Sequence, residues 1–449
     1  MAEELADRLD AYAETVLATG AASAMAVAVT DGERTLAART YGVPDDTMFQ
    51  FGSIGKSFTA IVALQLAEQG LLDLHAPVTE VLPWFAVGGT AAPITLHHLL
   101  THSSGLIRGA EIATGSNFDV VALADTARRL RGGGDEVFFV NNLYLNFTNV
   151  CRVKCKFCAF AVTGKQPSAY TWEIDKLVEH AVEVHERERY SEIHMVGGEN
   201  PHLEYSYYID LTRELHDALP DVHLKLYTAS EIHHMHKLSG LPHAQILTEL
   251  QEVGLGSLPG GGAEVFADRV RRLVAPGKEH PDNWIATHRA AHGIGMPTHC
   301  TMLYGHVENY EERVEHWMRL RDLQDETGGF LAFVPLPFHP ENTVFQRRGW
   351  RFSTGYDDLK MVAASRLMLD NIPNIKAYWI MLSTPVAQVA LHYGANDIQG
   401  TVMEEQIAHA AGAVTPQEEK VQSLVTLIRD AGRIPVQRDT LYNVVRTFA

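Results

Sequence analysis

Three cysteines within eight residues are the strongest chemical signal in this chain of 449 residues. Cys151, Cys155 and Cys158 follow the spacing Cys-x-x-x-Cys-x-x-Cys and are three of only four cysteines in the sequence. Cysteine thiolates are the usual ligands of iron–sulfur clusters. Three thiolates would leave one iron of a four-iron cluster without a protein ligand, and that iron could bind a small molecule. The spacing therefore predicts a [4Fe-4S] cluster with reactive chemistry at its open iron.

Zinc is the competing metal for a group of cysteines. A structural zinc ion takes four nitrogen or sulfur ligands in a closed tetrahedron. The fourth cysteine, Cys300, is far along the chain from the other three and is expected to be a small buried residue. Four cysteines in this arrangement do not make a disulfide framework either, so a reducing compartment is expected.

The cysteine spacing is that of the radical S-adenosylmethionine superfamily, and longer stretches narrow the resemblance. Segments similar to those of aminofutalosine synthases, enzymes of the futalosine route to menaquinone, are 144–151, 258–264, 301–306, 323–330 and 333–342. The resemblance runs from about residue 133 to the C-terminus. It implies that a 5′-deoxyadenosyl radical adds to 3-[(1-carboxyvinyl)oxy]benzoate to give 6-amino-6-deoxyfutalosine. S-adenosylmethionine is then consumed as a substrate, and an electron donor such as flavodoxin or ferredoxin is required.

The same resemblance implies a cofactor site. Phe157 occupies the position that in the superfamily lies near the adenine, and Gly197-Gly198-Glu199 matches the stretch that meets the methionine part of the cofactor. Ser230 and Glu231 could bond the ribose hydroxyls. Glu231 could equally be the first-turn acid of a helix, where the helix dipole favours a negative charge.

A substrate with two carboxylates needs hydrogen-bond donors around it. The candidate substrate-binding residues are Arg289, His306, His339 and Asn342. Single histidines in a chain with 23 of them are more often structural or surface groups, so these assignments rest on position alone.

The region that must position these residues alternates between strand and helix patterns. The expected strands are 140–147, 191–197, 222–228, 255–259, 298–304, 330–336, 375–381 and 395–400, and helix patterns include 175–188, 205–218 and 308–326. Such alternation indicates a parallel sheet with crossover helices, and eight units would close a (β/α)8 barrel. Active sites of these barrels lie at the carboxyl ends of the strands, which is where the cysteine loop and the glycine pair fall.

The first part of the chain has a different pattern. After a helix pattern at 3–17 and two short strand patterns, Ser53-x-x-Lys56 begins a further helix. With later stretches up to residue 105, it resembles the start of serine β-lactamases and penicillin-binding-type esterases, in which the serine is acylated and the lysine activates it. The later strand of that family, with its Lys-Thr-Gly or His-x-Gly motif, is not found before the barrel begins. We therefore expect an incomplete α+β segment at 1–125, a junction at 126–135, and a barrel with a C-terminal helical extension at 136–449.

Two alternative functions stay open on the sequence. One is a related radical enzyme of the same superfamily, either a cyclase of the same pathway or a deazaflavin synthase. The other is a serine hydrolase or penicillin-binding-type module that uses Ser53 and Lys56.

Composition limits the partners. A net charge of −18 argues against nucleic acid, since binding phosphates needs clustered Lys and Arg. No apolar run reaches the ~20 residues of a spanning helix, and the acidic N-terminus does not resemble a signal peptide. A cytoplasmic enzyme with a small-molecule substrate is expected.

Overall fold

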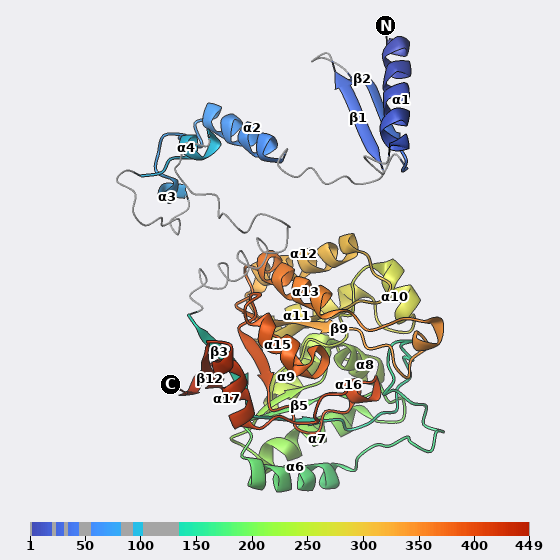
Figure 1. Cartoon of the computed structure of the whole chain (residues 1–449). Coiled ribbons are helices and arrows are strands. Elements are labelled where there is room, and N and C mark those ends of the chain that lie inside the picture. Colours follow the sequence, from blue (N-terminus) through green and yellow to red (C-terminus); the bar gives the residue numbers. More distant parts are fainter. Residues whose placement is uncertain are drawn as a thin grey trace. The chain divides into compact units, whose positions relative to one another are not determined.

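The computed structural model describes residues 2–19, 24–30, 35–44, 55–81, 93–101 and 134–448. The chain divides into two compact units, Met1–Ala110 and Glu111–Ala449 (Figure 1). The predicted junction at 126–135 lies outside the described residues apart from Gly134 and Asp135. Among the described residues, no helix is both long and apolar enough to cross a membrane.

The N-terminal unit begins with a helix and a hairpin. These elements are α1 (Ala2–Ala18), β1 (Met25–Thr30) and β2 (Thr35–Tyr41). The two strands pair antiparallel. The hydroxyl of Tyr41 donates to Oδ1 of Asp10 at 2.7 Å, which ties the end of the hairpin to α1.

Three further helices belong to the same unit. They are α2 (Gly55–Glu68), α3 (Val78–Val81) and α4 (Leu96–Leu100). Thr95 caps α4 and forms an antiparallel bridge with Pro77. Of the two candidate hydrolase residues, Lys56 is the second residue of α2, and Ser53 lies outside the described residues.

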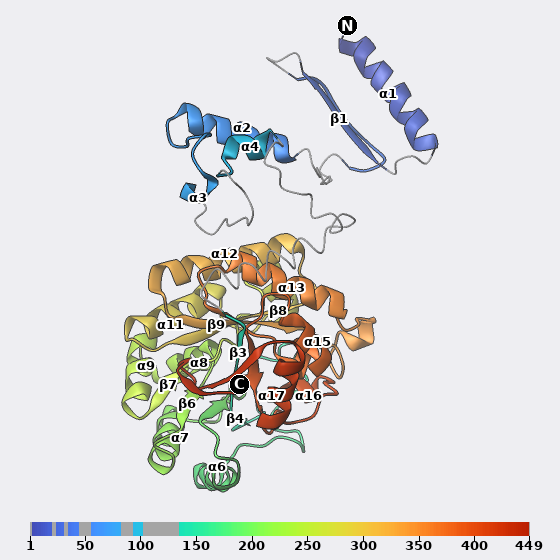
Figure 2. The same cartoon turned by 60° about the vertical axis from the view of Figure 1, so that its left-hand side comes forward.

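The larger unit alternates strands and helices. Its strands are β3 (Glu136–Val140), β4 (Asn142–Leu145), β5 (Glu192–Met195), β6 (His223–Leu226), β7 (Leu255–Ser257), β8 (Thr298–Tyr304), β9 (Phe330–Pro337), β10 (Asn374–Ile375), β11 (Asp397–Gly400), β12 (Ile434–Arg438) and β13 (Val444–Thr447). Its helices are α6 (Ile174–Glu188), α7 (Tyr205–Ala218), α8 (Ala229–Ser239), α9 (His243–Glu252), α10 (Asp268–Val274), α11 (Pro281–Gly293), α12 (Tyr310–Thr327), α13 (Gly355–Met368), α14 (Trp379–Leu382), α15 (Thr384–Ala390), α16 (Ile407–Ala410) and α17 (Val421–Asp430). Figure 2 shows these helices arranged around the strands.

The strands from β3 to β11 pair in parallel, in the order that the alternation predicted. The hydrogen-bonded ladders form three sheets, which contain β4-β5-β6-β7, β8-β9-β10 and β11-β3. Single parallel bridges connect these sheets, from Leu258 to Thr298 and from Lys376 to Asp397. Because β3 leads directly into β4, the pairings return to the first strand. Eight strand positions are thereby linked in sequence, and we call them the ring; their hydrogen-bonded ladders form separate sheets and not one continuous barrel.

The pattern of buried side chains explains why these segments form strands or helices. All seven residues of β8 are buried, as expected for a parallel strand covered on both faces. In α6 the buried residues Leu177, Ala181 and Val184 recur at helical spacing and form its inner face. Helix α12 begins at the Asn309 capping box and ends at Gly328, whose φ of 66° suits glycine.

Two segments differ from the sequence prediction. The expected strand at 375–381 is only β10, and Trp379–Leu382 forms the buried helix α14. Short apolar runs do not distinguish a buried strand from a buried helix, which explains the error. The C-terminal extension also contains strands: β12 pairs parallel with β3, and β13 pairs antiparallel with β12.

Candidate active site

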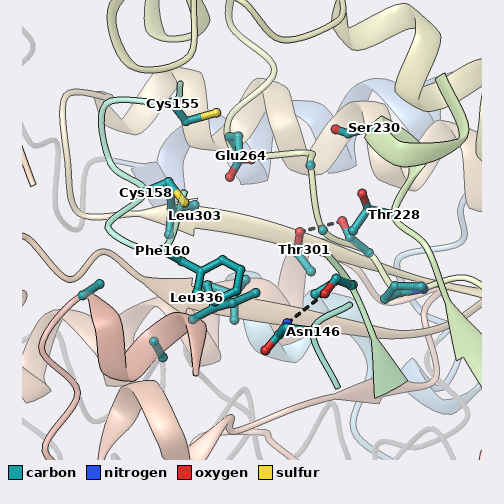
Figure 3. A pocket seen from close by; sticks show the side chains of 18 of the residues that line it. Asn146, Cys155, Cys158, Phe160, Thr228, Ser230, Glu264, Thr301, Leu303 and Leu336 are labelled. Atoms are coloured by element: carbon teal, nitrogen blue, oxygen red, sulfur yellow. Dashed lines mark hydrogen bonds between the residues drawn. The ribbon is translucent and has the colours of Figure 1, made fainter. Parts of the chain in front are cut away.

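The cysteine loop follows β4 and is held in place by backbone hydrogen bonds. Cys151 N–H donates to the carbonyl of Val162 at 3.0 Å, and Cys158 N–H donates to the carbonyl of Cys155 at 3.2 Å. All three cysteines line one cavity of about 330 Å³. Figure 3 shows the thiols of Cys155 and Cys158 beside this space, with Ser230 on another part of the wall.

Most of the predicted site residues line this cavity. The predicted residues that line it are Cys151, Cys155, Cys158, Phe157, Gly197, Gly198, Glu199, Ser230, Glu231 and His339. They come from loops or helix starts that follow different strands of the ring. This agreement supports the expected placement of an active site at the carboxyl ends of the strands.

The three thiols lie on one loop and line one cavity, which is where a cluster would be held. Among the residues that the structure describes, no three His, Cys, Asp or Glu side chains converge as ligands of one metal ion would. A cluster needs a different arrangement because each cysteine ligates its own iron. Burial raises the pKa of the Cys155 and Cys158 thiols, so metal binding would have to displace their protons.

Gly197 and Gly198 are required by close packing against the cysteine loop. A Cβ on Gly198 would lie 2.2 Å from the carbonyl oxygen of Val150, and one on Gly197 would lie 2.6 Å from the Phe147 ring. Gly198 N–H also donates to the carbonyl of Thr148 at 3.0 Å. The pair therefore lets the strand end and the cysteine loop share one wall of the cavity.

Glu199 is a buried carboxylate beside the cysteine loop. Its Oε2 lies 2.9 Å from Nη2 of Arg152. Burial, together with the charge of Glu279, raises the pKa of Glu199 to about 7 despite this ion pair. The neighbouring Ser230 hydroxyl donates to Oε1 of Glu279 at 2.7 Å. A carboxylate of this kind can accept hydrogen bonds from an amino group when it is ionised.

Glu231 has a structural task in addition to lining the cavity. It forms a capping box with Thr228 at the start of α8. Its other oxygen, Oε1, accepts a hydrogen bond from Gly197 N–H at 3.0 Å. Of the two roles considered for Glu231, the helix-start acid is the one that this geometry displays, and ribose binding stays a prediction.

Three of the four predicted substrate ligands do not reach the cavity. Arg289 is on the exposed side of α11, where Nε and Nη2 donate to Glu326 at 2.6 and 2.7 Å. His306 is buried outside the cavity, with Nδ1 3.0 Å from Oε2 of Glu308. Asn342 is exposed and donates to the carbonyl of Ala410 at 2.9 Å. Position after a strand did not predict the direction in which each side chain points.

His339 is the substrate candidate that does line the cavity. Its Nε2 lies 2.9 Å from the carbonyl oxygen of Met381, and Nδ1 has no hydrogen-bond partner among the described residues. Cys300 is fully buried, as expected.

The sequence patterns did not predict a group of polar side chains inside the ring, which we call the floor. Its members are strand residues or neighbours of strands, and they also line the cavity: Tyr144, His194, Lys225, His299, Lys376 and Gln399. Charged side chains inside otherwise apolar strand runs, such as Leu224-Lys225-Leu226, were the signal available in the sequence. Buried charges are rarely found without partners or a function.

Matches to family models agree with the division of the chain. Residues 145–319 match the radical SAM superfamily, and residues 327–448 match the CofH/MqnC C-terminal region. Residues 9–132 match the β-lactamase family.

Solved structures share the fold of the larger unit. Methylornithine synthase (PylB) aligns with a TM-score of 0.57 at 18% identity, over 72% of this chain and 91% of its own. The [FeFe]-hydrogenase maturase HydG aligns with a TM-score of 0.56 at 16% identity, over 72% of this chain and 71% of its own. Together with the three-cysteine loop, these findings define the class as radical S-adenosylmethionine enzymes, which use a [4Fe-4S] cluster and S-adenosylmethionine.

Curated relatives identify the family within this class. The aminodeoxyfutalosine synthase of Thermus thermophilus is 45% identical over 73% of this chain and 88% of its own length. The Streptomyces coelicolor enzyme of that name is 44% identical over 71% and 85%. The 5-amino-6-(D-ribitylamino)uracil–L-tyrosine 4-hydroxyphenyl transferase of Methanopyrus kandleri is 40% identical over 71% and 87%. The chain belongs to the aminodeoxyfutalosine synthase family, and the alternative of a deazaflavin synthase is less supported.

Proposed function

We propose that this chain joins the 5′-deoxyadenosyl group of S-adenosylmethionine to 3-[(1-carboxyvinyl)oxy]benzoate and produces 6-amino-6-deoxyfutalosine. Methionine leaves when the C–S bond of S-adenosylmethionine breaks, and the enol-ether carboxylate leaves as bicarbonate with uptake of water. The observation that carries the proposal is a single cavity with two chemically different ends. Three thiols, a glycine pair and Glu199 line its loop end, and aromatic and basic strand residues line its floor. One end suits the cluster and cofactor, and the other suits an aromatic acid.

The residues have separate tasks in this proposal. Cys151, Cys155 and Cys158 hold the cluster, which when bound supplies the electron that breaks the C–S bond of S-adenosylmethionine. Glu199 accepts hydrogen bonds from the amino group of the methionine part. Phe157 contacts the adenine.

The substrate lies below the cofactor in this arrangement. Apolar side chains, among them Leu303 and Leu336, also line the cavity (Figure 3) and exclude water from the reacting carbons. His339 is a further hydrogen-bonding group for the bound molecules: Nε2–H donates to the carbonyl of Met381, and burial lowers the pKa of the ring, so the Nδ1, unpartnered among the described residues, accepts a hydrogen bond.

The test is an anaerobic assay with product analysis. The reconstituted protein is given S-adenosylmethionine, dithionite and 3-[(1-carboxyvinyl)oxy]benzoate, and products are identified by mass spectrometry. An adenosyl–substrate product that disappears in Cys155→Ala supports the proposal. Free 5′-deoxyadenosine without that product, from a protein that binds its cluster fully, contradicts the substrate assignment.

We also propose a cytoplasmic setting with a low-potential donor such as flavodoxin or ferredoxin. An exposed iron in a three-cysteine cluster needs a reducing compartment, and the net charge of −18 disfavours nucleic acid as a partner. Turnover that persists when reduced flavodoxin or ferredoxin replaces dithionite supports the donor assignment.

A further inference from the structure

Buried cationic side chains lie in and around the floor of the cavity, and they differ in their partners. Lys225 donates to Oε1 of Glu192 at 2.5 Å, and both side chains are buried. Arg438 makes an equally buried pair with Asp397, at 2.6 Å between Nη2 and Oδ2. Each of these cations therefore has a carboxylate partner.

Lys376 is different. Its Nζ donates to the neutral amide oxygen of Gln399 at 2.8 Å. Within 134–448 and the other described residues, no carboxylate lies within ion-pair distance of Nζ, although Lys376 is only 1% exposed. Burial lowers the pKa of Lys376 well below its usual range, and the more distant Asp397 offsets this only in part. Burial without a counter-charge therefore favours the neutral amine, and a bound anion would supply the counter-charge that stabilises the ammonium form.

A second unsatisfied group faces the same space. His299, on β8, is 3% exposed, and neither ring nitrogen has a hydrogen-bond partner among the described residues. Both His299 and Lys376 line the cavity, and the charge of Lys376 contributes to lowering the pKa of His299. An imidazole N–H that is buried and unpaired is a donor in need of an acceptor.

Flat aromatic groups stand beside this pair. The rings of Tyr144 and His194 stack at 4.2 Å between centroids with an interplanar angle of 1°. Tyr378 continues the stack, 6.5 Å from Tyr144 at 15°. All three line the cavity. Parallel rings next to Lys376, which has no carboxylate partner among the described residues, suit a planar aromatic acid better than an aliphatic acid.

We propose that Lys376 and His299 form a carboxylate subsite at the floor of the cavity, which binds the ring carboxylate of an aryl acid substrate. The identity of that substrate rests on the proposed function, whereas the subsite rests on the floor residues themselves. The cysteine loop and Gly197–Glu199 follow the strands, and the floor residues lie on them. An acid anchored at the floor therefore directs its other end toward the cofactor.

The experiment compares an acid with its neutral amide. Binding of 3-hydroxybenzoate and of 3-hydroxybenzamide to the reconstituted protein is measured anaerobically by titration calorimetry, with S-adenosylmethionine present. We expect the acid to bind about 10- to 100-fold more tightly, as for a hydrogen bond to a charged group. In Lys376→Met this preference should disappear, and Lys376→Arg should keep part of it.

Lys360→Met is the matched control, because Lys360 is exposed and its ammonium lies over the Tyr356 ring, 4.1 Å from the centroid. It should keep the full preference for the acid. Equal binding of acid and amide by the unchanged protein would overturn the subsite, and so would an unchanged preference in a cluster-replete Lys376→Met.

The two proposals fail in different ways. A preference for the acid that depends on Lys376, in a protein that forms no adenosyl product, keeps the subsite and removes the proposed substrate. Product formation with an unaltered KM for the acid in Lys376→Met keeps the function and removes the subsite.

Discussion

The two ends of the cavity are built in different ways. The loop end depends on backbone: hydrogen bonds hold the cysteine loop, and Gly197 and Gly198 leave room for it. The floor depends on charged side chains that reach the interior from separate strands, with buried pairs such as Arg438–Asp397. Backbone geometry suits a cofactor that is common to a whole superfamily. A set of side chains can be exchanged one at a time, so the floor is where substrate choice can change without disturbing the cofactor.

The floor should contribute strongly to stability, and Asp397→Asn tests this. It leaves the buried Arg438 without its counter-charge, and the expected loss is about 3–5 kcal/mol of unfolding free energy. Chemical denaturation followed by circular dichroism measures the loss. Glu326→Gln, which alters an exposed pair with Arg289, should have little effect. An Asp397→Asn protein as stable as the parent would show that the floor pairs are not needed for the fold.

A substitution at the loop end should reduce cluster binding strongly and should lower stability less than Asp397→Asn does. In Gly198→Ala the new methyl group would meet the carbonyl of Val150, and relief of that overlap must displace the cysteine loop at a cost of about 1–3 kcal/mol. We expect a large drop in iron and sulfide content after reconstitution. Gly293→Ala, where nothing lies within 4 Å, should keep full cluster content. Normal loading of Gly198→Ala would contradict the close-packing argument.

The loop end should also respond to pH through Glu199. Its carboxyl has a pKa of about 7 because of burial and the nearby Glu279. Above that pH it is ionised and accepts hydrogen bonds from the cofactor, and below it the protonated form accepts them poorly. Binding of S-adenosylmethionine should therefore strengthen several-fold from pH 6 to pH 8, measured by equilibrium dialysis. Glu199→Gln should bind more weakly and show a flat profile over this range.

The N-terminal unit should have the smallest effect on the radical reaction. Within the part of the chain that the structure describes, the residues that line the cavity lie between Tyr144 and Ala411, so we expect Ser53→Ala to leave product yield unchanged. The match of residues 9–132 to β-lactamases makes hydrolysis a separate question. Turnover of nitrocefin or p-nitrophenyl butyrate that is lost in Ser53→Ala would establish a second activity.

The loop end could be predicted from sequence because its residues lie in short contiguous motifs. Cys151–Cys158 and Gly197–Glu199 each carry their meaning within a few residues, and the structure brings them to one cavity. The floor could not be predicted in this way, because Lys225, His299 and Lys376 meet only through strand pairing.

The differences between the predicted and the observed placements have the same origin. Arg289 and Asn342 were selected by residue type and position, yet burial and side-chain direction depend on packing that only the fold supplies. The alternation of strands and helices predicted the order of strand pairing. The apolar run at 375–381 is too short for periodicity to distinguish a strand from a helix.

The pairing of β12 with β3 joins the end of this sequence to the beginning of the ring. Arg438 reaches Asp397, and the hydroxyl of Thr440 donates to Oε2 of Glu192 at 2.8 Å, so the surroundings of the floor are completed by residues that are synthesised after every strand of the ring. A growing chain on the ribosome can expose its cysteine loop long before those residues emerge. Formation of the substrate-binding floor must therefore follow synthesis of β12. A message cut short before Arg438 would yield a protein that has the thiols for a cluster but an incomplete carboxylate subsite.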